Sequence, residues 1–448
     1  MLFNPRSLGN EGDWDSWELF IMISIDALRE GGRLALVLPD SFFYPQKART
    51  RKRFFEEMTV EKVFSLGPDW FGPDVRMGTI VVQARRGRSK NASTLHSIVL
   101  SGALRQQAIR GQIPLSQIES TRSREIPVAR VLESPTYEIE VFRSIDDDRI
   151  MAAIAANSVC LSGADGLCER ARGEEINKAG LLWVCPSCLS PTTPGRKVKG
   201  GAYADKACEK CGHLLRPRFV DTDSLIVDRK PKGAFAPFID GDDIARRYCQ
   251  VAPRKWLRLG VPGWEYKDDS IYRSPKILLR QAGVGVFATL DETEARCPQS
   301  VYIYRLRDLP EFKGYKHEFV LAALLSRTVA YVVFKRFAEV DPAKAHAKLT
   351  HERIADLPIP RVDFRRRKDR TAHDAVVSRV RSLLEGKAQL GGTEDREIEQ
   401  ILREFWNLSA DDGAYINGEF FDLPEGQAIT DLFPNGRPKP FNRELETA

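Results

Sequence analysis

Apolar residues recur at helical spacing near the start of the chain. They lie three or four positions apart and are Trp14, Trp17, Ile21, Ile25 and Leu28. Asp15 and Glu18 have the spacing of a capping box before this stretch, and Gly31-Gly32 would end the helix after it. The continuous apolar run Leu34–Leu38 then predicts a fully buried strand that stops at Pro39.

Helix and strand patterns continue to alternate after this strand. A basic helix is expected from Gln46 to Met58, a strand from Val60 to Ser65, and a further strand from Thr79 to Gln83. Such alternation is typical of a doubly wound α/β sheet. A complete cofactor-binding domain of this class needs a glycine-rich turn before these elements, and the sequence shows no GxGxxG. We therefore expect an α/β fold with only the rear half of a Rossmann-like sheet.

Composition places the chain among ordinary proteins of two or three domains, with 448 residues, 42% hydrophobic and 29% charged. No apolar run approaches the ~20 residues that cross a bilayer, and no signal-peptide pattern is present. The expected location is cytoplasmic, with no membrane partner.

Positive charge is concentrated in a few short segments, although the formal net charge is only +6. The segments are KARTRKRFF, RRGRSK, VDRKPK and RVDFRRRKDR. Such clusters suit a polyanion such as double-stranded DNA, and solvated faces are the alternative for each one. Arg51 and Lys52, in the first cluster, are candidate DNA contacts.

Four of the eight cysteines form two CxxC pairs, Cys185 with Cys188 and Cys208 with Cys211, separated by 19 residues. This spacing predicts a zinc ribbon in which two tight turns direct four thiolates at one ion. Four sulfurs complete the coordination sphere, so the zinc would be structural. A redox dithiol is the alternative, but it needs a thioredoxin-like helix terminus that the sequence does not show. The basic residues between the pairs would either contact DNA phosphates or form a solvated tip.

The first ninety residues resemble part of an adenine-N6 DNA methyltransferase. The resemblance lies in GGRLALVLPDSFF and DWFGPDVRMGTIVVQARR, which are similar to the region after the catalytic loop in type IIG and phage-defence enzymes. In that family an upstream glycine-rich motif binds S-adenosylmethionine, and an Asn-Pro-Pro-aromatic loop grips the flipped adenine. Here Asn4-Pro5 is followed by Arg6 and Ser7, so it is either a worn remnant of that loop or an ordinary turn.

Residues 226–360 resemble the TaqI-type C-terminal specificity domain of the same enzymes. The resemblance is an ordered set of GDDIARRY, KILLR, one long apolar helix in HEFVLAALLSRTVAYVVFKRF, and IADLPIP. Target recognition needs side chains that reach base edges and phosphates. The candidates are Arg280 and Gln281, together with Lys344, His346 and Lys348. The alternative is that Arg280 pairs with a carboxylate and that the lysines are merely exposed.

The predicted organisation has five parts. They are a partial Rossmann-like methyltransferase domain (1–90), a connector with the start of the recognition domain (91–180), a zinc ribbon (181–216), an α+β target-recognition domain (217–360) and a helical tail (361–448). Three functions fit: a split-methyltransferase subunit completed by a partner with the S-adenosylmethionine and Asn-Pro-Pro-aromatic motifs, a non-catalytic DNA-binding module, or a truncated remnant. In each case we expect no catalysis by this chain alone, in restriction-modification or in phage defence.

Overall fold

The computed structural model divides the chain into two compact units, residues 1–153 with 414–422, and residues 154–413 with 423–448. Below they are called unit 1 and unit 2. The residues that the structure describes are 15–43, 47–67, 70–71, 78–87, 94–100, 102–134, 137, 143–176, 180–198, 201–229, 232–245, 247–282, 285–336 and 349–418.

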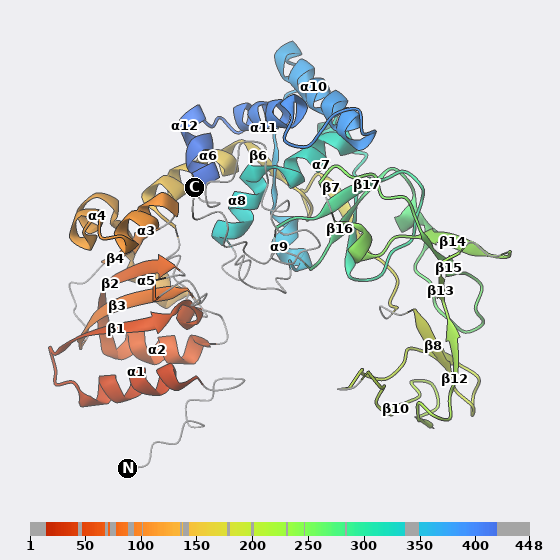
Figure 1. The fold of residues 1–448 in the computed structure, drawn as a ribbon, viewed down its shortest axis with the longest axis horizontal. Helices are drawn as coiled ribbons and strands as arrows, with labels where there is room; N and C mark the ends of the chain where they lie inside the picture. Colours follow the sequence, from red (N-terminus) through yellow and green to blue (C-terminus); the bar gives the residue numbers. More distant parts are fainter. Residues whose placement is uncertain are drawn as a thin grey trace. The chain divides into compact units, whose positions relative to one another are not determined.

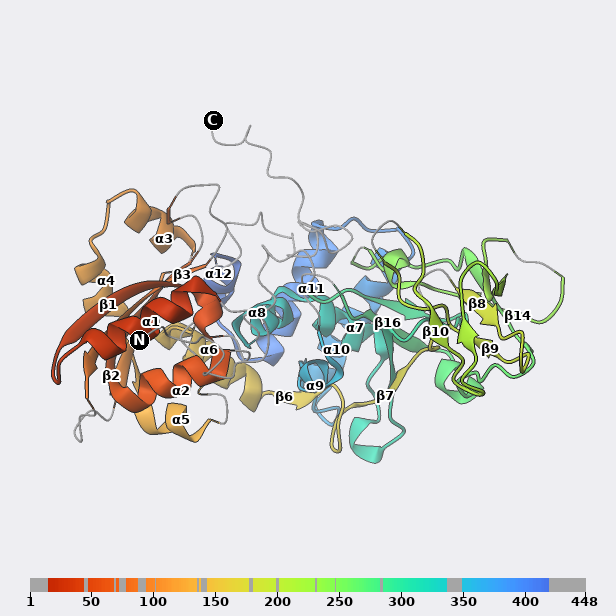
Figure 2. The same cartoon turned by 90° about the horizontal axis from the view of Figure 1, so that it is seen from below.

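Unit 1 is built on a five-stranded mixed sheet in the order β1-β3-β2-β4-β5. Its strands are β1 (Arg33–Pro39), β2 (Met58–Gly67), β3 (Thr79–Arg86), β4 (Thr94–Val99) and β5 (Arg124–Pro127). Its helices are α1 (Ser16–Ala27), α2 (Ala48–Glu57), α3 (Gly102–Ile109), α4 (Leu115–Arg122) and α5 (Val128–Glu133), with the 3-10 turn η2 (Asp40–Phe43). The unit boundary falls inside α6 (Ile145–Ala156), and most of α12 (Ala410–Gly418) belongs to unit 1. Helices α1 and α2 lie side by side on one face of the sheet (Figures 1 and 2).

Helix α1 forms as the capping pattern predicts. The Asp15 N–H donates to Glu18 Oε1 at 3.3 Å, which satisfies a backbone donor that the first turn leaves open. Ile21 and Ile25 are fully buried in the core between the helices and the sheet. The apolar period of the sequence therefore identified the correct face of α1.

Strand β1 is not the fully buried strand that its apolar run predicts. It lies at an edge of the sheet, and among the described residues it pairs only with β3, from Arg33↔Arg85 to Pro39↔Thr79. Leu34 and Leu36 pack against the helical side, whereas Val37, which points to the opposite face, is 57% exposed. An apolar run becomes a fully buried strand only if neighbours cover both faces and both edges. Among the described residues, one edge of β1 and the face that carries Val37 are not covered.

The first unit extends beyond the predicted boundary at residue 90. Strand β4 pairs parallel to β2, with Lys62↔His96, and β5 pairs antiparallel to β4. The other pairs of this sheet, β1 with β3 and β2 with β3, are antiparallel. The first part of the predicted connector is thus integral to the sheet.

Unit 2 contains a four-stranded antiparallel sheet in the order β17-β16-β18-β7. Its strands are β7 (Cys168–Arg172), β16 (Lys276–Arg280), β17 (Ala288–Asp291) and β18 (Val301–Leu306). A two-stranded sheet pairs β6 (Ser158–Cys160) with β19 (Pro358–Pro360), and a hairpin pairs β10 (Lys206–Ala207) with β11 (Leu214–Leu215). One three-stranded sheet has the order β13 (Ile226–Val227), β15 (Lys255–Arg258) and β14 (Phe235–Phe238). Another has the order β12 (Asp221–Ser224), β8 (Leu181–Val184) and β9 (Pro191–Thr192). The 3-10 turns are η4 (Gly241–Asp243), η5 (Asp269–Tyr272) and η6 (Pro310–Phe312).

The helices of unit 2 are α7 (His317–Leu325), α8 (Arg327–Arg336), α9 (His351–Ala355), α10 (Arg367–Leu384) and α11 (Thr393–Phe405). The single long apolar helix predicted over α7 and α8 is wrong, because Ser326 adopts extended backbone between them, with ψ 156°. The Ser326 hydroxyl donates to Ala323 C=O at 2.7 Å and accepts from the Val329 N–H at 3.1 Å, so it caps the new helix. The Glu399 carboxylate accepts the Arg327 N–H at 3.0 Å and stabilises the same helix start.

Among the residues that the structure describes, no single helix is long and apolar enough to cross a membrane. The bent pair α7 and α8 meets that test only when its two helices are taken together, across a 55° bend.

The C-terminal helices α10 and α11 are part of unit 2. The buried Arg247 guanidinium forms an ion pair with Asp395 of α11, and its Nη1 lies 3.6 Å from Glu399 Oε1. Losing one partner would leave a buried charge uncompensated, so this contact ties the helices firmly to the unit.

Candidate nucleic-acid interface and metal site

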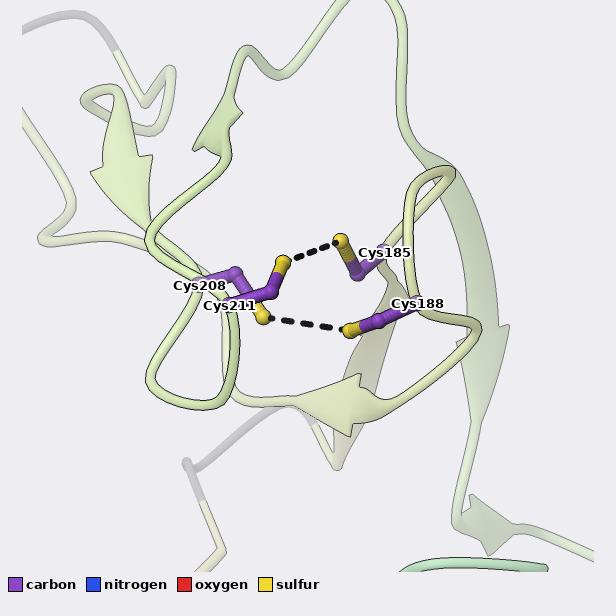
Figure 3. A group of neighbouring side chains, drawn as sticks. All are labelled: Cys185, Cys188, Cys208 and Cys211. Carbon is purple, nitrogen blue, oxygen red and sulfur yellow. Dashed lines mark hydrogen bonds between the residues drawn. The ribbon is translucent and has the colours of Figure 1, made fainter.

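Four cysteine side chains converge between two turns of the cysteine segment, defined here as residues 181–220. Their sulfurs all lie within 4.8 Å of one another (Figure 3). Cys185 Sγ is 3.6 Å from Cys211 Sγ, and Cys188 Sγ is 3.7 Å from Cys208 Sγ. The structure therefore brings together all four predicted ligands, Cys185, Cys188, Cys208 and Cys211.

The two turns share one hydrogen-bond pattern. In the first, the Leu189 N–H donates to Cys185 C=O at 2.8 Å, and the Cys185 N–H donates to Ser190 C=O at 3.0 Å. In the second, the Gly212 N–H donates to Cys208 C=O at 2.9 Å, and the Cys208 N–H donates to His213 C=O at 2.8 Å. Leu189 and Gly212 occupy the same position in the two turns and both have a positive φ, 56° and 74°. A left-handed residue there closes each turn so that both cysteines face one point.

The donor set fits a tetrahedral metal ion. With metal–sulfur bonds of about 2.3 Å, the edges of a tetrahedron are about 3.8 Å long, close to the two short sulfur–sulfur distances. The Ser190 hydroxyl and N–H hydrogen-bond to Cys188 Sγ and lower the pKa of this thiol to about 6, which favours the thiolate that a metal requires. A small core of Trp183, Cys185, Cys208 and Leu215 supports the site.

A basic surface backed by the buried rings of Tyr302 and Tyr304 lies at the edge of the main sheet of unit 2. Tyr302 pairs with Arg172, and Tyr304 pairs with Arg170, so these side chains share one face of β18 and β7. The Arg172 guanidinium lies 6.0 Å from the centroid of the Tyr302 ring. Both arginines are exposed, and among the described residues neither has a carboxylate within 4.0 Å.

Gln281 and His351 complete this surface. Gln281 Nε2 donates to Tyr302 Oη at 2.7 Å, and the His351 ring lies against the Tyr302 ring with 3.8 Å between centroids. Arg170 Nη1 donates to His351 C=O at 3.4 Å. We call Arg170, Arg172, Gln281, Tyr302, Tyr304 and His351 the Tyr302 face.

Two side chains of the Tyr302 face, His351 and Tyr304, carry polar atoms that make no hydrogen bond to the described residues. Burial, together with the positive charges of Arg170 and Arg172, lowers the pKa of His351 to about 4, so the ring is neutral near pH 7. Within the described part of the chain, His351 Nε2 and Tyr304 Oη are buried and have no hydrogen-bond partner. Exposed cations such as Arg170 and Arg172, and partly exposed polar side chains such as Gln281 and His351, are the groups that bind phosphates and base edges.

The predicted DNA contacts divide into three sets. Gln281 is on the Tyr302 face, and its C=O accepts the Leu349 N–H at 2.9 Å. Leu349, the first described residue after the second predicted cluster, therefore lies beside this surface. Lys344, His346 and Lys348 themselves, and the candidate loop residues Asn4 and Pro5, lie outside the described residues.

The remaining candidates point elsewhere. Arg280 alternates with Gln281 and faces the other side of the strand, where its Nη2 is 3.9 Å from Asp242 Oδ1 and its side chain is 12% exposed. Arg51 is buried in unit 1, where it donates to Phe42 C=O at 2.5 Å and to Tyr137 C=O at 3.1 Å, so it is not available to phosphate. Its neighbour Lys52 is exposed.

Sequence reasoning missed Arg170, Arg172, Tyr302 and His351. The first three lie in two segments with alternating side chains, CERAR and QSVYIYRL, which indicate strand faces. The two segments are more than 120 residues apart, however, and only the fold shows that they pair.

Comparison with known proteins assigns the region around this surface. Residues 236–359 match the family described as TaqI-like C-terminal specificity domain. No curated protein matches the chain.

Several solved structures are similar to parts of the chain. The type IIG restriction endonuclease BpuSI is 13% identical, with a TM-score of 0.39 over 94% of this chain and 52% of that one. The type IIL restriction-modification enzyme MmeI is 8% identical, with a TM-score of 0.39 over 91% and 53%. The HsdS subunit from Thermoanaerobacter tengcongensis is 14% identical, with a TM-score of 0.23 over 58% and 50%. The chain thus spans about half the length of these structures.

The family match covers Gln281, Tyr302, Tyr304 and His351, and β7 adds Arg170 and Arg172 to the same sheet. The surface therefore lies largely within the region that is similar to a TaqI-like C-terminal specificity domain.

Proposed function

We propose that this chain is the target-recognition part of a site-specific adenine-N6 DNA methyltransferase, acting in restriction-modification or phage defence. The observation that carries the proposal is the Tyr302 face, a cationic surface backed by two buried tyrosine rings in a sheet that residues 236–359, similar to a TaqI-like specificity domain, help to form. Arg170 and Arg172 would bind backbone phosphates, and Gln281 and His351 would contact base edges.

Unit 1 would be the rear half of the methyltransferase sheet, completed by a partner. Two features support this. Strand β1 has one edge with no partner among the described residues, and the helix above it, α1, exposes Phe20 (66%) and Ile23 (52%). A strand added along β1, with a helix packed on Phe20 and Ile23, would cover both features and remove an aggregation-prone edge. The partner would carry the S-adenosylmethionine and Asn-Pro-Pro-aromatic motifs, on a separate subunit.

The cysteine segment would be a structural zinc ribbon. The four sulfurs fit a tetrahedral ion, and four thiolates leave no coordination position for a reacting water. Bound zinc would fix the two turns relative to each other and contribute no chemistry to methyl transfer.

The DNA-binding part of the proposal is tested with Arg170→Ala/Arg172→Ala. A selection from random duplexes with the full chain first identifies the bound sequence, and binding is then measured by fluorescence anisotropy. We expect a loss of affinity of at least tenfold, because two phosphate contacts disappear. The matched control is Arg365→Ala/Lys387→Ala, which removes the same charge from two exposed residues already paired with Asp363 and Glu385. Equal affinities of the two double variants would exclude the Tyr302 face as the binding surface.

The assembly part is tested with Phe20→Glu. Since Phe20 is exposed, the isolated chain should keep its stability, whereas assembly with the partner and adenine methylation should be lost. Gln107→Glu, at an exposed position of α3, is the control. The chain alone should not bind S-adenosylmethionine in calorimetry, and micromolar binding would contradict the split-enzyme proposal.

A catalytically inactive DNA-binding module is the alternative. It shares the Tyr302 face but needs no partner at β1. Specific DNA binding with no assembly partner and no methylation would favour it.

A further inference from the structure

Most of the chain's net positive charge lies in the cysteine segment. Residues 181–220 contain seven Lys and Arg but only two Asp and Glu, a formal charge of +5, whereas all 448 residues together reach +6. Four thiolates with one divalent ion would add a charge of about −2 at the centre of the segment, and its surface would remain cationic.

The cations of the cysteine segment differ in how they are paired. Lys206 is paired with Glu209 at 2.8 Å and also donates to Thr192 and Thr193, which makes it a structural residue. Arg196, Lys197, Lys210 and Arg218, in contrast, are exposed, and no carboxylate of the described residues lies within 4.0 Å of them. These four charges have no role inside the segment.

An exposed aromatic ring lies beside this charge. The Phe219 N–H donates to Arg216 C=O at 2.9 Å, which closes a turn of Arg216, Pro217, Arg218 and Phe219. The Phe219 side chain is 75% exposed, whereas the neighbouring core of the segment buries Trp183 and Leu215. An exposed aromatic ring in the same turn as the exposed Arg218 suits a polyanion that also offers apolar surface, and DNA has this combination.

The cysteine segment is connected to the specificity domain by packing as well as by the chain. Strand β8 leads into the first cysteine turn, and its Leu182 packs in one core with Phe238 and Leu257, both inside the matched family region. Strand β12, which leaves the segment, pairs with β8 from Asp221↔Val184 to Ser224↔Leu181. The cysteine segment is therefore held in place by the same core as the domain that is proposed to recognise the target.

We propose that the cysteine segment is a second DNA-contacting element, which binds duplex DNA outside the recognised sequence. Arg196, Lys197, Lys210 and Arg218 contact backbone phosphates, and Phe219 packs into the minor groove against sugars and base edges. This inference rests on the proposed function, since it assumes that the specificity domain holds the target. It adds affinity without sequence information, because phosphate contacts are the same for every sequence.

The first experiment measures salt dependence. The full chain, Arg196→Ala/Lys197→Ala/Arg218→Ala, and the control Lys313→Ala/Arg365→Ala/Lys387→Ala bind a labelled duplex of about 40 base pairs at several salt concentrations. Each lost phosphate contact lowers the slope of log K against log salt by about 0.9, so the first triple variant should lose about 2 to 3 in slope. Its affinity at ~0.1 M salt should fall at least tenfold, whereas discrimination between target and non-target duplexes stays the same. Slopes that match those of the control variant would overturn the proposal.

The second experiment separates the contribution of the Phe219 ring to DNA binding from that of the cations. Phe219→Ala should weaken binding about fivefold without changing the salt slope, because no ion is released, and Phe219→Trp should restore the affinity. A metal-to-protein ratio equal to that of the unmodified chain shows that each variant keeps its fold. If Phe219→Ala leaves DNA binding unchanged and instead removes binding of the partner subunit, the surface docks protein and the proposal is wrong.

Failure of this inference can be told apart from failure of the proposed function. If Arg170→Ala/Arg172→Ala weakens duplex binding at least tenfold and the triple variant of the cysteine segment has no effect, only the second DNA contact is excluded. If the unmodified chain binds no duplex, both proposals fail.

Discussion

The cysteine segment and the specificity domain are neighbours in one unit, yet they are stabilised in opposite ways. The segment has strands of two to four residues and a buried core of Trp183, Cys185, Cys208 and Leu215. The specificity domain buries α7 and β16 almost completely and neutralises the charge of Lys276 inside its core with Asp291. The first region depends on four sulfurs and the second on apolar burial, so different perturbations should unfold them.

The two regions also use charge differently. In the specificity domain, cations such as Lys276 and Arg247 are buried and paired, and they hold the fold. In the cysteine segment, exposed cations without a carboxylate leave their charge for a partner. A basic residue therefore says little about function until its burial and its partner are known.

The largest expected effect is removal of the proposed zinc ion. Binding of structural zinc supplies about 10–16 kcal/mol in small zinc domains, far more than a core of this size can provide. Chelation, or Cys208→Ser, should therefore unfold residues 181–220 and leave the specificity domain folded. Hydrogen exchange monitored by mass spectrometry can follow both regions in one sample, with Cys249→Ser, at an exposed cysteine outside the cluster, as the control. If residues 181–220 of the metal-free protein kept full protection from hydrogen exchange, the two regions would not differ in what stabilises them.

Lys276→Met should cost about 3–5 kcal/mol of unfolding free energy, because it leaves the Asp291 carboxylate buried and unpaired. Arg258→Met, which breaks the exposed pair with Asp223, should cost no more than about 1 kcal/mol. Urea denaturation measures both. A second change, Asp291→Leu, should recover much of the loss, and a double variant as unstable as Lys276→Met would contradict a charge origin.

Acid should weaken the specificity domain through His317. Burial lowers the pKa of His317 to about 4, against about 6.5 in an unfolded chain, and its Nε2 accepts the Leu306 N–H at 3.3 Å. The unfolded state thus binds a proton first, so the stability from this group is complete above about pH 6.5 and is lost as the pH falls towards 4. His317→Gln should flatten this part of the stability curve, measured by urea denaturation between pH 7 and pH 4. Parallel curves for the two proteins would exclude His317 as the source.

The smallest effect is expected at the break between α7 and α8. Ser326→Ala removes a helix cap and should cost about 1 kcal/mol, whereas Ser326→Gly should cost only a few tenths. Thermal denaturation of the two variants tests this order. A larger cost for glycine would mean that the helix break depends on backbone stiffness and not on the hydroxyl.

The sequence allowed local features to be predicted more accurately than faces and neighbours. The capping box of α1 and the convergence of the four cysteines were foreseen, because each follows from residues close together or from fixed ligand spacing. Full burial of β1 was predicted wrongly, since an apolar run does not reveal that one edge has no neighbour among the described residues. The break at Ser326 was also missed, because the carboxylate that stabilises it, Glu399, comes 73 positions later.

The same limit explains the candidate interface. Arg280 and Gln281 are adjacent in sequence but face opposite sides of the strand, so only one of them lies on the Tyr302 face. Arg170 and Arg172 belong to a segment that was predicted only as a connector and the start of the recognition domain (91–180). Register across β7 and β18 decides which cations share a surface, and a single sequence does not contain that register.

The edge of β1 that has no partner among the described residues affects how much of this protein can accumulate in a cell. If a partner strand binds there, unit 1 gains stability in proportion to the logarithm of the partner's concentration, by mass action. Chains made in excess would then keep an open seven-residue strand and would be removed by proteolysis or aggregation. The amount of this chain that stays folded would then follow the amount of its partner.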